Sequence, residues 1–172
     1  MATELRPDLA PELVPVAWLL GTWRGLGVGG YPTIEEFRFS QEISFAEFSK
    51  PYLHYLSRSW LLDDSGTEVR PLAQETGYWR PQPDDALEVV LVHPTGYAEI
   101  WLGEIDGAKI ELRSDVVART ESAKAYTAGH RLYGLVEGDL MWAFDMAAVG
   151  VPLQPHLSAK LTRVPSGERS GP

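Results

Sequence analysis

Hydrophobic and polar residues alternate one by one along much of the chain. The clearest alternating stretch lies between residues 36 and 45. One of its faces carries Phe37, Phe39, Gln41, Ile43 and Phe45, and the other carries Glu36, Arg38, Ser40, Glu42 and Ser44. A period of two residues is typical of a β-strand that is buried on one side. The pattern therefore predicts a strand with one face in a core and the other in solvent.

Further strand-like segments follow at short intervals. They cover residues 52–62, 68–80, 86–92, 97–104, 109–117, 125–136, 139–146 and 156–162. Turn-forming sequences separate most of them, and Asp106-Gly107 is typical of a two-residue type I′ hairpin. The connections leave almost no room for crossover helices, so neighbouring strands are expected to run antiparallel. Roughly ten such strands predict a single all-β, up-and-down antiparallel barrel that is wide enough to enclose a ligand.

A short apolar stretch precedes the first strand. Residues 11–20 are expected to form one or two helical turns over one end of the barrel, because their prolines are tolerated near a helix start. The next residues spell a Gly-x-Trp-x-Gly-x-Gly motif made of Gly21, Trp23, Gly25 and Gly27. Glycine permits sharp turns and close strand contacts, and we expect the Trp23 indole to plug this end of the barrel.

Composition limits the classes of function. The chain has 172 residues and a formal net charge of −9, which argues against non-specific binding to nucleic acid or to anionic lipid. It has no cysteine, which excludes disulfides, zinc–thiolate sites, iron–sulfur clusters and thiolate-ligated or covalent haem. It shows no signal segment and no apolar run approaching about 20 residues. We expect a cytoplasmic protein with a flexible segment at 1–12, one domain at 13–164 and a disordered tail at 165–172.

His156 stands out among the four histidines. It follows Pro155, whose fixed φ makes the approach to the last strand stiff, and a stiff approach suits an axial ligand with one ring orientation. Strict alternation, however, places His156 on the face opposite that of Leu157. Two alternatives remain open. Either His156 departs from the alternation, or the barrel is partly polar inside and partly covered outside.

Two other residues are candidates for lining a cavity. His93 continues the alternating apolar face of residues 87–91, and Met146 ends a similar apolar face. If these faces point inward, His93 lies near the rim of the barrel and Met146 lies in its interior. An ordinary core role is the alternative for both residues. His54 and His130 alternate less clearly with apolar neighbours, and no role is assigned to them.

The chain resembles the nitrobindin family of haem-binding β-barrels from about Pro15 to Val164. The opening Gly-x-Trp-x-Gly-x-Gly motif is moderately specific, because lipocalins and fatty-acid-binding proteins open in a similar way. The closing Leu153-Gln154-Pro155-His156 makes the combination specific. The matching motifs are, in order, residues 21–27, Thr76-Gly77-Tyr78-Trp79-Arg80-Pro81, Glu88-Val89-Val90, Thr95-Gly96 and Pro152-Leu153-Gln154-Pro155-His156-Leu157.

The resemblance implies a ten-stranded barrel, of the lipocalin and fatty-acid-binding-protein type, with one haem b per subunit at its mouth. It implies that His156 is the proximal iron ligand and the catalytic residue, and that Thr33 and Lys124 are further haem contacts. His93 and Met146 are expected to line the same pocket. The implied activity is the isomerisation of peroxynitrite to nitrate at ferric haem, together with binding of nitric oxide. A homodimer is one expected assembly.

Two other functions fit the same sequence. The chain could carry a fatty acid or another small apolar ligand, with His156 as a polar group at the mouth of the barrel. It could also transport haem without catalysis. A Soret band that depends on His156 would separate the haem protein from the carrier. The nitrate yield from peroxynitrite would separate the enzyme from the transporter.

Overall fold

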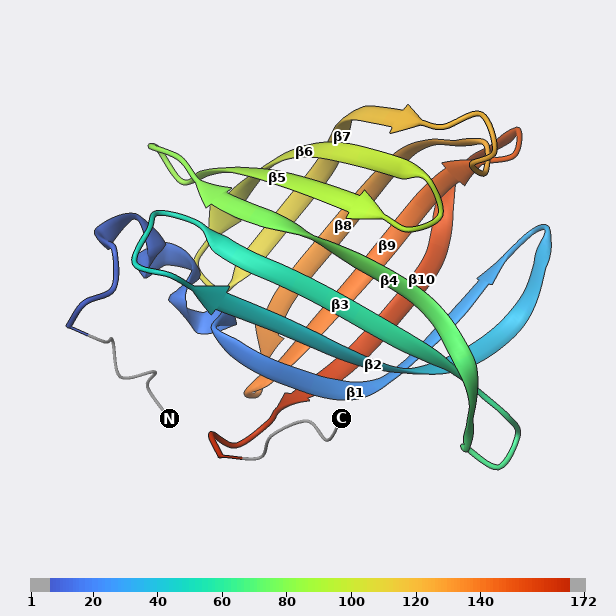
Figure 1. Cartoon of the computed structure of the whole chain (residues 1–172), viewed down its shortest axis with the longest axis horizontal. Helices are drawn as coiled ribbons and strands as arrows, with labels where there is room; N and C mark the ends of the chain where they lie inside the picture. Colours follow the sequence, from blue (N-terminus) through green and yellow to red (C-terminus); the bar gives the residue numbers. More distant parts are fainter. Residues whose placement is uncertain (1–6, 168–172) are drawn as a thin grey trace.

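Ten antiparallel strands close into one barrel in the computed structural model, which describes residues 7–167. The elements are the 3₁₀ helix η1 (Pro11–Leu19) and the strands β1 (Gly21–Tyr31), β2 (Ile34–Glu47), β3 (Leu53–Leu62), β4 (Glu68–Pro81), β5 (Ala86–His93), β6 (Tyr97–Asp106), β7 (Lys109–Arg119), β8 (Tyr126–Val136), β9 (Asp139–Ala148) and β10 (Val151–Arg163). Each strand pairs with its neighbours in the chain, and β1 pairs with β10 to complete the ring (Figure 1). The predicted up-and-down barrel is confirmed.

The terminal segments predicted from the sequence overlap the described range only in part. Residues 1–6 and 168–172 lie outside the described residues. Helix η1 begins at Pro11, within the segment expected to be flexible. Among residues 7–167, no helix is long and apolar enough to cross a membrane.

Alternating side chains build the barrel interior, as the period of two predicts. In β2, the buried residues are Phe39, Gln41, Ile43 and Phe45, and the intervening side chains face outward. The glycines of the opening motif allow β1 to approach its neighbours closely. A Cβ at Gly25 would lie 2.1 Å from the Lys160 carbonyl oxygen, and a Cβ at Gly27 would lie 2.3 Å from a ring carbon of Phe39. Neither position has room for a side chain.

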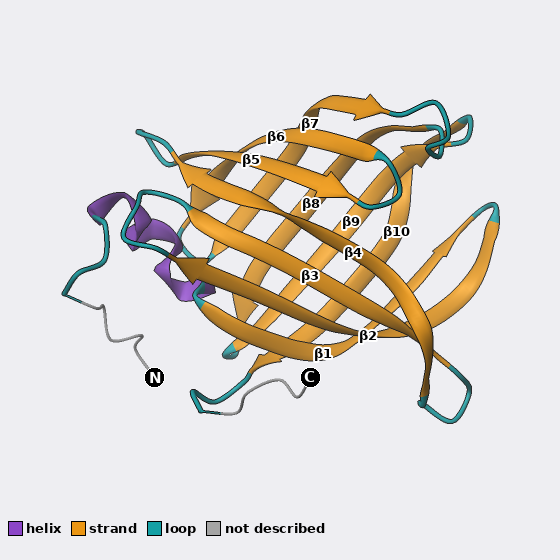
Figure 2. Ribbon diagram, in the orientation of Figure 1, coloured by secondary structure: helices purple, strands orange, loops and turns teal. Residues whose placement is uncertain are grey.

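Helix η1 closes one end of the barrel (Figure 2). Its residues Leu13, Val16 and Leu19 are fully buried in the same core cluster as Trp23. The Trp23 Nε1–H donates a hydrogen bond to the Leu19 carbonyl oxygen at 2.8 Å, so the indole is satisfied although it is buried. The guanidinium of Arg163 lies 4.1 Å from the Trp23 ring centroid. The Trp23 indole therefore fills this end of the barrel, as the sequence predicts. The opposite end is left for a ligand.

Candidate functional site

A cavity of about 600 Å³ lies inside the barrel, with its opening at the end remote from η1. Its apolar lining comes from Phe37, Phe39, Leu61, Leu72, Phe144, Met146 and Leu157. Its polar lining includes Gln41, Ser57, Ser59, Glu75, His93, Glu99, Lys124, Arg131 and His156. The cavity has the volume of a small-molecule site, and its apolar side chains lie beside an unusually large number of polar and charged ones.

His156 reaches this cavity because β10 contains a β-bulge. Pro155 pairs with Asp145 on β9, whereas Leu157 pairs with Phe144, so one extra residue is inserted in β10 at His156. The inserted residue breaks the strict alternation, and both His156 and Leu157 line the cavity. Of the two alternatives left open by the sequence, the structure shows the departure from alternation.

The His156 ring is held in one tautomer. Its Nδ1 lies 2.9 Å from the Gly30 carbonyl oxygen, and because a carbonyl can only accept, Nδ1 carries the proton and donates it. This leaves Nε2 with a free lone pair. Edge contacts with Tyr31 at 5.5 Å and Phe144 at 5.8 Å, measured between ring centroids, fix the ring plane. Such an imidazole is suited to ligate a metal through Nε2.

The surroundings of His156 favour its neutral form. Burial lowers the pKa of the imidazole, the hydrogen bond to Gly30 opposes that shift, and the charge of Lys124 lowers the pKa further. The net pKa lies below the ordinary value for histidine. A metal ligand must be deprotonated at the coordinating nitrogen, so these surroundings reduce the competition between a proton and a metal.

A buried ion pair crosses the interior of the cavity from β8 to β4. Arg131 on β8 donates from Nη1 and Nη2 to the two carboxylate oxygens of Glu75 on β4, at 2.6 and 2.8 Å. The Tyr55 hydroxyl donates to the same carboxylate at 2.6 Å. Burial raises the pKa of Glu75, but the charge and hydrogen bonds of Arg131, with smaller contributions from His93 and Tyr55, lower it to about 2. Glu75 is therefore ionised at neutral pH.

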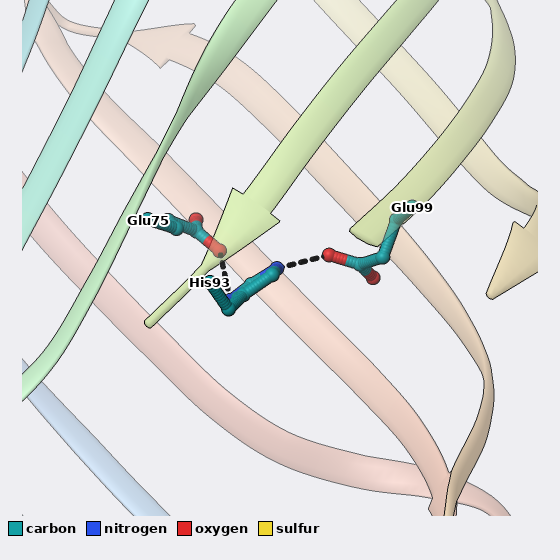
Figure 3. A group of neighbouring side chains, drawn as sticks. All are labelled: Glu75, His93 and Glu99. Atoms are coloured by element: carbon teal, nitrogen blue, oxygen red, sulfur yellow. Dashed lines mark hydrogen bonds and ion pairs between the residues drawn. The ribbon is translucent and has the colours of Figure 1, made fainter. Parts of the chain in front are cut away.

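His93 joins this pair to a second buried carboxylate (Figure 3). Its Nδ1 lies 3.6 Å from Glu75, and its Nε2 contacts Glu99, which also accepts a hydrogen bond from the Tyr126 hydroxyl at 2.6 Å. One ligand atom from each of Glu75, His93 and Glu99 lies within 4.8 Å of the others, so the group could hold a metal ion. The two carboxylates nevertheless lie beside different ring nitrogens. The imidazole bridges the carboxylates, and only one of its nitrogens could serve a given ion.

The cavity gathers most of the residues singled out in the sequence. His156, Lys124, His93 and Met146 all line it. His93 ends β5, which lies five strands from β10 in either direction around the ring, so it occupies the wall opposite His156. Thr33 is exposed in the turn between β1 and β2 and is not among the residues that line the cavity.

Three residues that shape this site were not singled out from the sequence. They are Glu75, Glu99 and Arg131, and the alternation contains the signal that would have found them. Each of them lies an even number of residues from an inward-facing aromatic residue, and therefore on the same face of its strand. The pairs are Glu99 and Trp101, Glu75 and Trp79, and Arg131 and Tyr133. A charged residue on the inward face of a strand must be paired. Searching for such positions would have identified all three.

The low pKa of Glu75 predicts a loss of stability in acid. The pKa is about 2 in the folded chain and near 4.5 in the unfolded chain, so the carboxylate stabilises the fold above pH 4.5. This contribution, roughly 3 kcal/mol, should be lost as the pH falls from about 4.5 to 2. Urea unfolding at several pH values between 7 and 3 measures the decline. Glu75→Gln should be less stable at pH 7 and decline less steeply, whereas parallel curves for the two proteins would contradict the assignment.

The residues present fit a haem group. An imidazole whose Nδ1 is bonded to Gly30 lines the cavity close to Phe144, and such a ring suits a proximal iron ligand through its other nitrogen. Lys124 and Arg70 also line the cavity and are exposed, so they can pair with propionates. A closed barrel with this cavity and this histidine has the fold and the kind of residues that a haem-binding β-barrel needs.

Comparison with known proteins identifies the family. Residues 12–163 match the model of the THAP4-like, heme-binding beta-barrel domain family, and the chain belongs to this family. The resemblance to nitrobindin is confirmed.

Similar proteins cover nearly the whole chain. A protein of Nocardioides sp. named peroxynitrite isomerase is 55% identical over 163 residues, which cover 95% of this chain and 99% of that protein. A ferric nitrobindin-like protein of Kineococcus radiotolerans is 48% identical and covers 95% of this chain and 99% of its own length. The crystal structure of Rv2717c from M. tuberculosis matches with a TM-score of 0.83 at 39% identity, covering 92% of this chain and 100% of that one.

Proposed function

We propose that this chain is a peroxynitrite isomerase that holds haem b through His156 and converts peroxynitrite to nitrate. The observation that carries the proposal is the His156 side chain, an imidazole that lines the cavity, whose pKa is lowered by burial and whose Nδ1 donates to the Gly30 carbonyl oxygen. The names of the similar proteins from Nocardioides and Salinispora tropica, the latter 48% identical, support the same activity.

The chain's own residues would orient the cofactor and keep water away from it. The Gly30 carbonyl accepts a hydrogen bond from the His156 ring, which would orient the ring toward the iron and increase the basicity of Nε2. Phe144, Met146 and Leu157 provide an apolar wall beside that ring. Lys124 offers a cation to propionates or to an incoming anion, although burial lowers its pKa below the ordinary value for lysine.

The reaction needs no partner for electron transfer. Peroxynitrite and nitrate have the same atoms and the same charge, so the conversion is an isomerisation without an external reductant or oxidant. Bound haem would supply a Lewis-acidic iron for the anion and the means to break its O–O bond. Since His156 would be the protein's ligand to that iron, nitric oxide is expected to bind to the haem as well.

Two measurements test the proposal. Titration of the full-length chain with hemin should produce a Soret band that saturates at one haem per chain. Stopped-flow mixing of the ferric protein with peroxynitrite should then show decay faster than in buffer or with an equal concentration of free hemin, and nitrate should account for the product. A protein that binds haem but leaves the decay rate and the nitrate yield unchanged would be a haem transporter.

A further inference from the structure

Arg131 is a buried cation inside the cavity, and its charge is already matched by a carboxylate of the same chain. Its side chain is only 3% exposed. Both terminal nitrogens donate to Glu75, and Nη1 also lies 3.2 Å from the Tyr133 hydroxyl. A two-point pair of this kind is the geometry with which arginine binds any carboxylate. The cavity therefore contains a complete carboxylate-binding site.

Aromatic rings hold the guanidinium in place. Its central carbon lies 4.8 Å from the ring centroid of Phe144, 5.0 Å from that of Trp101 and 5.9 Å from that of Trp142. The Tyr55 hydroxyl completes the set of donors to the carboxylate. The position of Arg131 is therefore fixed by its surroundings, and the carboxylate that it holds is surrounded by donors.

We propose that Glu75 determines which head groups the inner part of the cavity accepts, by occupying the two terminal nitrogens of Arg131 and keeping the carboxylate of a fatty acid away from this buried arginine. An incoming carboxylate would find both terminal nitrogens of Arg131 already paired. It would also face the negative charge of Glu75 itself, in surroundings where charges are weakly screened. Glu99 lies next to His93 and is only 1% exposed. This inference does not depend on the proposed haem chemistry.

The proposal explains how the inner part of the barrel can reject a fatty-acid head group and still leave the exposed Lys124 and Arg70 to pair with the carboxylates of another ligand. The apolar lining alone would accept an alkyl chain, because Phe39, Leu72 and Phe144 offer the same contacts to any hydrocarbon. The distinction must therefore come from the polar end of the ligand. Replacing Glu75 with neutral glutamine would leave Arg131 without its carboxylate and create a site for an anionic head group.

The test compares decanoate with 1-decanol, which share an alkyl chain and differ in charge. Binding to the haem-free, full-length chain is measured at pH 7 by calorimetry and by intrinsic tryptophan fluorescence, to which Trp142 in the cavity lining contributes. Wild type should bind decanol at least as tightly as decanoate. Glu75→Gln should bind decanoate about tenfold or more tightly than wild type does, as one ion pair of about 1.4 kcal/mol would give, with little change for decanol.

Two further variants serve as controls. Glu42→Gln removes a carboxylate that pairs with Arg24 and Arg58 outside the cavity lining, and it should gain no affinity for decanoate. Glu75→Gln/Arg131→Gln should lose the affinity gained by the single variant. Circular dichroism checks that each variant is folded.

Three results would overturn the proposal. They are a wild-type chain that binds decanoate at least tenfold more tightly than decanol, an equal gain in Glu42→Gln, and a gain that persists without Arg131. The first comparison uses only the wild-type chain, so it tests the proposal even if a variant fails to fold. Because no haem is present, a failure here leaves the peroxynitrite proposal untouched, and the reverse also holds.

Discussion

Replacement of His156 with alanine is expected to remove the Soret band of histidine-ligated haem and to abolish the accelerated decay of peroxynitrite. The bulge in β10 brings this residue into the cavity lining, and the hydrogen bond from Nδ1 to Gly30 leaves Nε2 as the nitrogen that would bind the iron. Loss of a residue that only supports a metal ligand typically costs roughly 10–100-fold in affinity, so loss of the ligand itself should cost more. Hemin titration followed by absorbance measures the change.

Matched variants separate ligation from a general effect on the fold. His54 contacts Thr76, and His130 contacts Glu111, and neither histidine lines the cavity. His54→Ala and His130→Ala should therefore keep the wild-type spectrum. His156→Gly with added imidazole should recover the histidine-ligated spectrum, because the small residue leaves space for a free ring. A wild-type spectrum in His156→Ala would show that another group binds the iron.

Replacement of Arg131 with methionine is expected to destabilise the fold by about 3–5 kcal/mol. The substitution conserves most of the volume but leaves the Glu75 carboxylate in the barrel without its cation. The carboxylate would then have to be protonated or hydrated inside the barrel, and either change costs free energy. Urea unfolding at pH 7 measures the difference in the free energy of unfolding.

The double variant and a surface pair identify the cause of this loss. Glu75→Gln/Arg131→Met should be more stable than Arg131→Met alone, because the unpaired charge is gone. Arg58→Met removes an arginine that pairs with Glu42 and is 43% exposed, so it should cost less than about 1 kcal/mol. If Arg131→Met costs no more than Arg58→Met, the buried pair does not stabilise the fold.

Most of the barrel could be predicted because the alternation of residues within each strand shows which of its faces is buried. The alternation in β2 identifies Phe39 and Ile43 as buried without any knowledge of the neighbouring strands. The last strand is the exception, since it was expected to begin at His156 but begins at Val151. Pro152 and Pro155 lack the backbone N–H that a ladder uses, so this segment does not read as a strand. The structure accommodates them through shifts in the register between β10 and β9.

The candidate site could be predicted only in part, because its residues meet across the barrel. Glu75 and Arg131 lie 56 residues apart, on strands β4 and β8 that are not hydrogen-bonded neighbours. Alternation places each of them inward, but their meeting depends on strand tilt and on closure of the ring. The same holds for His156 and His93, which reach one cavity from opposite walls.

The sequence by itself determined the class of fold and the inward faces of most strands, and it singled out His156 as a candidate ligand, because these follow from local periodicity and short motifs. Only the tertiary structure decided that a bulge directs His156 into the cavity, that Gly30 fixes its tautomer, and that Glu75 neutralises Arg131. The physical reason is that hydrogen bonds and ion pairs between distant strands depend on register and on closure, and neither is encoded in any single segment of the chain.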